Sequence, residues 1–269
     1  MSSAPSTTGA RPDAVGFLTD TTLCIGCKAC EVACKNWNKL EMDAVQFTGY
    51  SYDNTVDLGA ATWRHVAFIE QPIKQGPAGR VAWLMMSDVC KHCVNAACME
   101  ACPTGAIIRT EFGSVVIQDD VCNGCGYCVP ACPFGVPQLD RADGGSHKCT
   151  LCYDRLRGGL TPACATACPT GSIRFGPVGE LGEAGRERVA TLKEQGLDEA
   201  RLYGNGELGG TGGISGLNAM FVLNGPPDAF NLPARPRLPR LNIVPAAAAT
   251  TVAAAGYCLV AAFFYRHPD

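Results

Sequence analysis

Apolar and polar residues alternate in two stretches of the first half of the chain. In residues 61–86 the alternation runs through β-branched and aromatic side chains, and a segment with Gly and Pro at 75–79 divides it. Residues 107–117 repeat the pattern on a shorter scale around Glu111-Phe112-Gly113. A period of two residues is typical of half-buried strands, so both stretches predict β-hairpins.

Helical spacing of apolar residues is found later in the chain. Residues 181–195 place Val189 and Leu192 on one stripe, which predicts a surface helix. The Gly-rich stretch 204–216 lacks the Lys-Ser/Thr pair of a phosphate-binding loop and predicts an ordinary loop. The Pro-rich stretch 225–241 predicts an extended linker. Short strands with one amphipathic helix favour an α+β fold.

The longest apolar run lies near the end of the chain. Residues 245–265 contain no charged side chain, and at 1.5 Å per residue these 21 residues span roughly 31 Å, the thickness of one hydrocarbon core. Three aromatic residues close the run as an interfacial anchor. We therefore expect a single transmembrane helix over 242–266, with a buried helix of a soluble protein as the alternative. Three arginines precede the run and one follows it; this count favours a cytoplasmic soluble part but leaves the side of the cell membrane open.

Composition narrows the classes of function. The 269 residues are 17% charged and 47% hydrophobic, which excludes a disordered polymer. A net charge of −3 provides no basic face, so nucleic acid is not expected as a partner. Residues 1–15 show neither the basic and apolar regions of a secretory signal nor a twin arginine, and we expect them to form a disordered tail.

Cysteine is the residue type that indicates the chemistry of this chain. Sixteen of its 17 cysteines fall between Cys24 and Cys168, and Cys258 is expected to fill space in the apolar run. The sixteen form four motifs of C-x2-C, a spacer and C-x3-C, with spacers of 2, 4, 2 and 11 residues. Motif 1 is Cys24, Cys27, Cys30 and Cys34; motif 2 is Cys90, Cys93, Cys98 and Cys102; motif 3 is Cys122, Cys125, Cys128 and Cys132; motif 4 is Cys149, Cys152, Cys164 and Cys168.

This repeated pattern is typical of the ligands of [4Fe–4S] clusters. The chain must bend around one iron within C-x2-C, and Gly26, Gly124 and Gly126 ease that bend. Residues i and i+4 share one face of a helix, so the C-x3-C step predicts a short helix, which the proline after three of the motifs ends. Sixteen thiolates are the ligands of four [4Fe–4S] clusters.

Two other uses of cysteine fit the pattern less well. Disulfide frameworks belong mainly to small secreted domains. Zinc ribbons use C-x2-C pairs separated by roughly 15–20 residues, without a C-x3-C-P continuation. A structural zinc protein is the alternative from another class, and an absorption spectrum separates the two because zinc–thiolate sites are colourless.

The arrangement of ferredoxins predicts which cysteines share a cluster. In two-cluster ferredoxins the fourth cysteine of each motif binds the cluster of the other motif. Motifs 2 and 3 are separated by only 19 residues and should pair locally, which leaves motifs 1 and 4 to pair around them. The expected sets are quartet 1, Cys24, Cys27, Cys30 and Cys168; quartet 2, Cys90, Cys93, Cys98 and Cys132; quartet 3, Cys122, Cys125, Cys128 and Cys102; and quartet 4, Cys149, Cys152, Cys164 and Cys34.

The pairing predicts two interleaved ferredoxin-like 2[4Fe–4S] units with inserted β-hairpins. The expected parts are an outer unit over 16–89 and 140–224, an inner unit over 90–139, the linker over 225–241 and the transmembrane helix over 242–266. The sequence offers no nucleophile–base pair, so we expect no catalytic residue. The candidates for offsetting the negative charge of the clusters are Lys28, Lys91, His92 and Lys148.

Several of these segments resemble a known family. Motif 1 within Thr19–Asn38 is similar to the first motif of the iron–sulfur (β) subunits of membrane-bound formate dehydrogenases. The likeness extends from residue 16 to the C-terminal apolar run. It is also carried by Cys90-Lys-His-Cys93, by Asn123-Gly-Cys125-Gly-Tyr-Cys128, and by Lys148-Cys149-Thr-Leu-Cys152 followed by Asp154-Arg155.

The resemblance implies a four-cluster electron-transfer subunit of a molybdopterin oxidoreductase complex. The implied partners are a molybdenum- or tungsten-pterin catalytic α subunit that oxidises formate and a membrane γ subunit of cytochrome b type that passes electrons toward quinone. It also implies that electrons enter at quartet 1 and pass through quartets 4 and 2 to quartet 3 and the membrane. The equivalent subunit of a membrane-bound hydrogenase or of a sulfur-compound reductase is the alternative, because no substrate-contacting residue lies on this chain.

Overall fold

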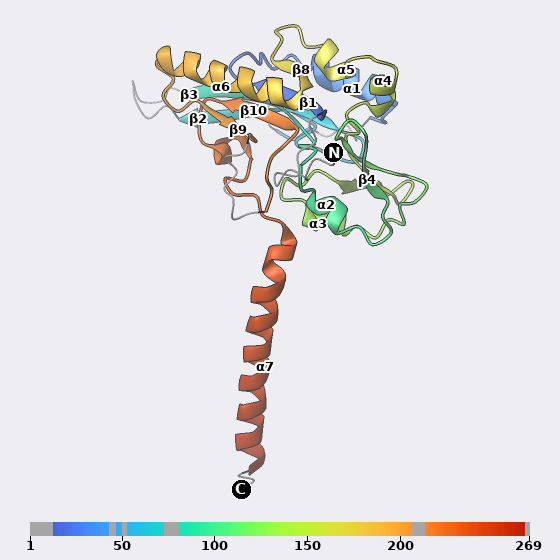
Figure 1. Cartoon of the computed structure of the whole chain (residues 1–269), viewed down its shortest axis with the longest axis vertical. Coiled ribbons are helices and arrows are strands. Elements are labelled where there is room, and N and C mark those ends of the chain that lie inside the picture. Colours follow the sequence, from blue (N-terminus) through green and yellow to red (C-terminus); the bar gives the residue numbers. More distant parts are fainter. Residues whose placement is uncertain (1–12, 43–46, 50–52, 73–80, 206–212, 267–269) are drawn as a thin grey trace, which may run out of the picture.

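The structure is a computed structural model that describes residues 13–42, 47–49, 53–72, 81–205 and 213–266. The strands and most of the helices form one body, from which the C-terminal helix α7 extends (Figure 1). The cysteine motifs all lie in this body, so the fold of the body decides how they meet.

A four-stranded sheet joins the two ends of the body. Its strand order is β8 (Ile173–Pro177), β1 (Val15–Asp20), β10 (Ala219–Leu223) and β9 (Arg201–Tyr203). Strand β1 pairs in parallel with β10 and antiparallel with β8, so Phe17 lies opposite both Ala219 and Phe175. Strands β1 and β10, from the start and the end of the body, therefore lie next to each other although they are far apart in the sequence.

Both faces of this sheet are covered by apolar side chains. Helix α6 (Val178–Glu194) packs on one face, where Leu18 and Val222 belong to its apolar cluster. Phe17 and Phe221 join two other clusters. Because β10 is covered on both faces, it is an uninterrupted apolar run without the alternation of a half-buried strand.

Helix α6 corresponds to the surface helix expected over 181–195, and it begins three residues earlier. Leu192 is 2% exposed and Val189 packs against the same cluster, as the apolar stripe predicts. Gly185 allows the helix to approach the sheet closely, because a Cβ there would lie 2.7 Å from Cδ1 of Leu202.

Antiparallel hairpins form the rest of the described strands. They pair β2 (Arg64–Pro72) with β3 (Val81–Val89), β4 (Ile107–Arg109) with β5 (Val115–Ile117), and β6 (Gln138–Leu139) with β7 (Ser146–His147). The first two lie in the stretches where alternation predicts hairpins, while the turn expected at 75–79 lies outside the described residues. Most of the Gly-rich stretch is also outside them, and Gly213 forms an isolated bridge with Arg237.

The Pro-rich stretch 225–241 is not the extended linker that its composition predicts. It forms the 3-10 helices η1 (Pro227–Phe230) and η2 (Pro239–Asn242). Phe230, Leu232 and Leu238 are at most 2% exposed and pack with strand β10 in one apolar cluster. These three side chains, spaced between the prolines, attach the stretch to the body.

We expect Phe230→Ala to destabilise the protein by about 3–5 kcal/mol, the usual cost of truncating a buried Phe. Phe230 is 0% exposed, whereas Leu241 in the same stretch is 37% exposed. The measurement is the urea concentration at which the folded signal of the purified protein is half lost. Leu241→Ala is the matched control, and equal shifts in the two variants would contradict a role of this stretch in the core.

The tail expected over 1–15 ends earlier than the sequence indicates. Residues 1–12 lie outside the described residues, but Ala14 is 5% exposed and β1 begins at Val15. The N–H of Val15 donates to the carbonyl of Phe112 (3.0 Å). The last residues of the expected tail are thus part of the sheet and its packing.

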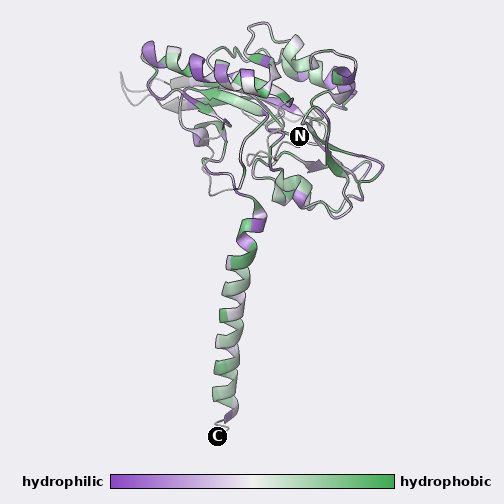
Figure 2. Ribbon diagram, in the orientation of Figure 1, coloured by the Kyte–Doolittle hydropathy of each residue, from purple (hydrophilic) through white to green (hydrophobic). Residues whose placement is uncertain are grey.

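Helix α7 (Ile243–Arg266) has 24 residues and occupies the position expected for the transmembrane helix, 242–266. It follows η2 directly, and its most apolar window is 0% buried by the rest of the protein. Figure 2 shows hydrophobic residues along its length. Among the described residues it is the one helix long and apolar enough to cross a membrane.

Candidate metal centres

The C-x2-C loops of the four motifs share one backbone feature. The residue before the second cysteine has a positive φ in each: 67° at Gly26, 42° at His92, 68° at Gly124 and 64° at Leu151. Positive φ is strained for residues other than glycine, yet His92 and Leu151 are 1% and 0% exposed. Packing therefore maintains the bend in motifs 2 and 4, where glycine is absent.

Short helices carry the third cysteine of every motif. These helices are α1 (Ala29–Asn38) for Cys30, α2 (Ala97–Glu100) for Cys98, α3 (Cys128–Ala131) for Cys128 and α5 (Ala163–Thr166) for Cys164; α4 (Tyr153–Arg157) directly follows Cys152. In motifs 2, 3 and 4 the helix ends before the Cys-Pro pair. Helix α1 continues through Cys34 to Asn38, since Lys35 stands where the other motifs have proline.

Three of the expected quartets each line one cavity. Each cavity takes three cysteines from one motif and the fourth from another motif. Quartet 1 lines a cavity with Cys24, Cys27, Cys30 and Cys168. Quartet 2 lines another with Cys90, Cys93, Cys98 and Cys132. Quartet 3 lines a third with Cys102, Cys122, Cys125 and Cys128.

The cysteines of quartet 4 are electrostatic neighbours in a buried region. Burial raises the pKa of Cys149 well above its usual range, and the negative charges of nearby cysteines raise it further. These neighbours are, in order of effect, Cys34, Cys90, Cys152 and Cys164. Burial likewise raises the pKa of Cys34 to about 12, with Cys164 the strongest of the charges that act on it. Cys34 thus lies with motif 4 and away from the cavity that holds the rest of motif 1.

Raised thiol pKa values in quartets 2 and 4 favour a bound cation there. Burial raises the pKa of Cys98 to about 12, and it raises that of Cys93 well above its usual range. Thiolates crowded in a dry site are unfavourable until a metal replaces their protons. Groups of four closely spaced thiols, all of them buried in quartet 4, therefore fit a metal centre with thiolate ligands, and iron bound as [4Fe–4S] needs four thiolates for each cluster.

The repeated hexapeptides Cys102–Ile107 and Cys168–Ile173 form loops that stabilise thiolates. The Sγ of Cys102 lies 3.6 Å from the hydroxyl of Thr104, and the Sγ of Cys168 lies 3.7 Å from that of Thr170. At both cysteines partial burial favours the thiol, but the hydroxyl and several backbone N–H groups outweigh it and lower the pKa. The repeat noticed in the sequence therefore supplies hydrogen-bond donors to the cysteine that crosses to the other motif.

Two lysines proposed as charge-offsetting groups are buried close to quartets 2 and 4. Lys91 is 1% exposed and its Nζ lies 2.5 Å from Asp88. Lys148 is 3% exposed and donates to the carbonyls of Val115 and Cys149. Burial alone would lower the pKa of Lys148, but the negative charge of the surrounding cysteines raises it.

The other two candidates behave differently. Lys28 is half-exposed and pairs with Asp53 (3.0 Å) and Glu31 (3.5 Å) at the edge of quartet 1. His92 does not supply a positive charge: burial and then the charge of Lys148 lower its pKa well below its usual range. Its Nδ1 accepts a hydrogen bond from the N–H of Val115 (3.0 Å), as a neutral imidazole does. The expectation for His92 is therefore wrong.

One buried cation, Arg64, is not among the candidates that the sequence offers. Arg64 opens strand β2 inside the alternating stretch, where the pattern predicts only a hairpin. In the structure it is 1% exposed, and its Nη1 donates to the hydroxyl of Ser87 (2.9 Å). The alternation of the strand could have identified Arg64. It lies two residues before the buried Val66, so both side chains are on the inward face of the strand.

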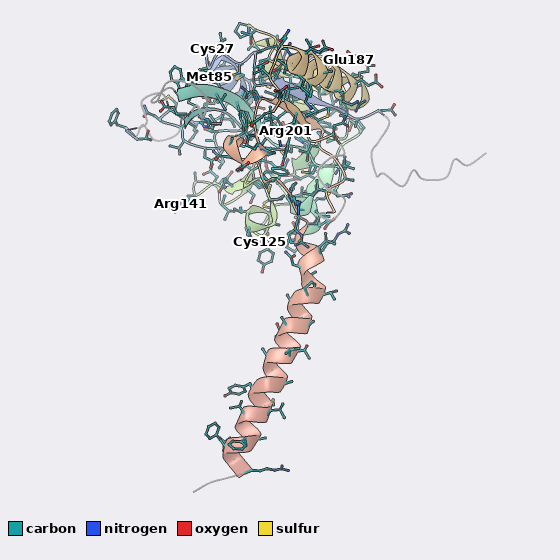
Figure 3. The ribbon with its side chains drawn as sticks, turned by 90° about the vertical axis from the view of Figure 1, so that its left-hand side faces the viewer. Cys27, Met85, Cys125, Arg141, Glu187 and Arg201 are labelled. Carbon is teal, nitrogen blue, oxygen red and sulfur yellow. The ribbon has the colours of Figure 1, made fainter. Side chains whose placement is uncertain are left out.

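The motifs reach the protein surface at two separate places. Cys27 and Cys125 are exposed, while most other motif cysteines are buried or half-buried. In Figure 3 Cys27 lies at the end of the body remote from α7, and Cys125 lies at the end from which α7 leaves. The cysteine-bearing region therefore extends across the body from its far end to the base of α7.

Comparison with protein families identifies the chemistry of these centres. Two models, each described as a 4Fe-4S dicluster domain, match residues 23–106 and 81–178. Together with the sixteen motif cysteines, they define an iron–sulfur protein of ferredoxin type, and they support four [4Fe–4S] clusters as its cofactors.

Known relatives specify the family further. The chain is 40% identical over 247 residues to the nitrate-inducible formate dehydrogenase iron–sulfur subunit of Escherichia coli, an alignment that covers 90% of this chain and 80% of the relative. It is 42% identical over 229 residues to the formate dehydrogenase iron–sulfur subunit of Haemophilus influenzae, covering 83% and 70%. The B subunit of the E. coli anaerobic dimethyl sulfoxide reductase is 38% identical over 169 residues, covering 62% and 75%.

This chain belongs to the family of formate dehydrogenase iron–sulfur subunits. Its relatives are the iron–sulfur subunits of oxidoreductase complexes, so the chain is an electron-transfer subunit and not an enzyme by itself. The resemblance seen in the sequence is confirmed.

Proposed function

We propose that this chain conducts electrons from a formate-oxidising molybdenum- or tungsten-pterin subunit to a membrane partner of cytochrome b type that reduces quinone. The observation that carries the proposal is the arrangement of cysteines across the body, from the exposed Cys27 to the exposed Cys125 at the base of α7. A protein that only bound zinc for structural reasons would have no need of metal sites in series between two surfaces.

The four quartets are the proposed ligand sets of four [4Fe–4S] clusters, which supply one-electron transfer when bound. The three cavities support quartets 1, 2 and 3, and the charges around Cys149 support quartet 4. The family models match motifs in chain order and leave the pairing open, so the cavities carry this part of the proposal. An inner unit of motifs 2 and 3 then lies within an outer unit of motifs 1 and 4.

Charge interactions between cysteines of different quartets support the order 1, 4, 2, 3. Among the charges that act on Cys30 of quartet 1 is that of Cys164 of quartet 4. Cys149 of quartet 4 is likewise influenced by Cys90 of quartet 2. Cys98 of quartet 2 is influenced by Cys128 of quartet 3. Each quartet therefore neighbours the next one in the order that the family resemblance implies.

Two exposed patches are the proposed docking faces. Near Cys27, Ile25 is 60% and Val32 is 66% exposed, which suits an apolar contact with the catalytic subunit. Near Cys125, which lies at the end of the body from which α7 leaves (Figure 3), Tyr127 is 62% and Leu139 is 43% exposed. With α7 as a single membrane span, this second patch is held close to the bilayer and to the membrane partner.

A redox titration of isolated membranes with substrate tests the function. Formate should bleach the visible absorbance of the clusters in membranes that contain the complex, and a water-soluble quinone should restore it. Bleaching by hydrogen, or restoration by a sulfur compound or a sulfoxide in place of quinone, would instead assign the chain to the corresponding complex. No response to any donor would contradict an electron-transfer role.

Iron content tests the number of clusters. The anaerobically purified protein should hold about sixteen iron atoms per chain, four for each cluster. The measurement is metal analysis against protein concentration, with acid-labile sulfide determined on the same samples. About twelve irons at full occupancy, or tightly bound zinc, would contradict the four-cluster proposal.

A further inference from the structure

Arg64 is among the most deeply buried side chains of the protein. It is 1% exposed, and its guanidinium carbon lies 4.7 Å from the centre of the Phe17 ring. Its Nη1 donates to the hydroxyl of Ser87 (2.9 Å) and approaches the carbonyl of the same residue (3.4 Å). Burial of a guanidinium is costly unless anions compensate its charge, so the surroundings of Arg64 need to supply them.

The donors of Arg64 are only partly used by the protein. Nε and Nη2 are fully buried and have no hydrogen-bond acceptor among the residues that the structure describes. The hydroxyl of Ser87, which holds Nη1, also lies 3.2 Å from the Sγ of Cys30. The N–H groups of these two buried nitrogens are therefore available to another acceptor close to quartet 1.

The cysteines whose thiolate charge would act most strongly on Arg64 belong to two different quartets. In order of effect they are Cys164, Cys30, Cys149 and Cys34. Three of these belong to quartet 4 and Cys30 belongs to quartet 1. Conversely, Arg64 favours the thiolate at Cys30, Cys34 and Cys164. The guanidinium thus lies at the junction between quartets 1 and 4.

We propose that Arg64 is a shared cation that raises the reduction potentials of the two clusters that quartets 1 and 4 would hold, with Nε and Nη2 as N–H donors toward cluster sulfur. The proposal rests on the proposed function, since it presupposes that these quartets hold clusters. A cluster with four thiolate ligands becomes more negative by one charge when it is reduced. A nearby buried cation and N–H donors therefore stabilise the reduced form more than the oxidised form.

The position of Arg64 gives this effect a role in electron transfer. Quartets 1 and 4 are the first two in the proposed order, so a cation between them acts on both members of the first transfer step. Because both potentials rise together, the free-energy difference for electron transfer between the two clusters changes little. Entry of an electron from the catalytic subunit becomes more favourable.

Lys148 provides an internal comparison at the next junction. The cysteines that act on it most strongly are Cys90, Cys98, Cys149 and Cys132, three from quartet 2 and one from quartet 4. Its Nζ already donates to two backbone carbonyls, so it contributes charge rather than unused donors. Removal of the Lys148 charge should therefore affect quartets 2 and 4, and leave quartet 1 largely unchanged.

The test is an EPR-monitored redox titration of the full complex purified from membranes. The variants are Arg64→Gln, Arg64→Met and Arg64→Lys, with Lys148→Met as the matched control, and the signals are assigned beforehand by substituting one cysteine of each quartet. In Arg64→Gln and Arg64→Met the equilibrium constants for one-electron reduction at quartets 1 and 4 should fall at least tenfold, a shift of 59 mV. Those at quartets 2 and 3 should change less than threefold.

The other two variants separate charge from structure. Arg64→Lys retains the charge and should shift quartets 1 and 4 less than the neutral variants do. In Lys148→Met the shifted signals should be those of quartets 2 and 4. If the neutral variants fail to hold about sixteen irons, Arg64→Lys and Lys148→Met carry the test. Arg64→Lys should then stay within threefold of wild type at quartets 1 and 4, and a tenfold fall there would overturn the proposal.

A purely structural role for Arg64 would lower the stability of the complex without moving any potential. Unshifted signals in iron-replete Arg64→Gln and Arg64→Met, or equal shifts at all four quartets, would also overturn the proposal. These outcomes leave the proposed function intact, provided that the wild-type complex shows four clusters. Absence of four clusters from the wild type would overturn the proposed function first, and it is detected before any Arg64 variant is made.

Discussion

Cys34→Ala should remove the cluster of quartet 4 and leave the cluster of quartet 1 in place. Cys34 belongs by sequence to the motif of Cys24, but helix α1 continues past Cys30 and places it one turn further on, beside Cys164 and Cys149. Loss of one of four thiolate ligands from a buried centre exposes iron to loss or exchange. The iron content should fall by about four atoms per chain, or the cluster should convert to a three-iron form.

The measurement combines iron analysis with EPR spectroscopy of the reduced protein. The signal that disappears or changes should be the one that is also lost when Cys152 is substituted. Cys258→Ala is the control: Cys258 is exposed on α7, remote from every motif, and its substitution should change neither iron content nor signals. Loss of the signal that depends on Cys24 would show that the pairing of motifs 1 and 4 is wrong.

Truncation after Arg240 should release the protein from membranes. It removes α7 and keeps Leu238, which is 0% exposed and completes the packing of the Pro-rich stretch. The deleted segment is uncharged up to Arg266 and long enough to span a hydrocarbon core. The truncated protein should fractionate with soluble proteins after a carbonate wash, with its iron content unchanged.

A point substitution checks that the apolar character of α7 is responsible. Val252 is 73% exposed near the middle of the helix. Val252→Arg places a charge at the centre of the span, at a cost of about 2.5–3.5 kcal/mol on the insertion scale, and should weaken membrane retention. Val252→Leu keeps the span apolar and should behave as wild type. A truncated protein that still sediments with washed membranes would show that the anchor lies elsewhere.

The sequence predicts the local parts of the centres because those parts depend on short-range geometry. The bend at Gly26 and Gly124 needs a positive φ, and the C-x3-C step needs one helical turn; both are read from neighbouring residues. Motif spacing, combined with the arrangement of two-cluster ferredoxins, also predicts the quartets, in which the fourth cysteine crosses to another motif. The hairpins in residues 61–86 and 107–117 are likewise predicted from the alternation of apolar and polar residues.

Long-range packing explains what the sequence did not indicate. Strand β10 is buried on both faces and has no period of two, and its partner β1 is about two hundred residues away. The Pro-rich stretch was misjudged because its composition is that of a linker, whereas Phe230 and Leu238 decide its packing. The alternation does not single out Arg64, because a charged residue in a strand is usually exposed and its burial depends on packing against Phe17 and Ser87 from other strands.

The parallel pairing of β1 with β10 imposes an order on biogenesis. β1 is synthesised first, but its parallel partner emerges only with residues 219–223, shortly before α7. All sixteen motif cysteines are synthesised before that point, whereas Lys91 and Val94 of motif 2 find their backbone partners Asn218, Ala219 and Gly216 only with the same late segment. Between the synthesis of Cys168 and that of Ala219 the ligands are therefore present while the sheet is still open. Iron delivery has this interval in which to reach the interior before the last strand closes the sheet.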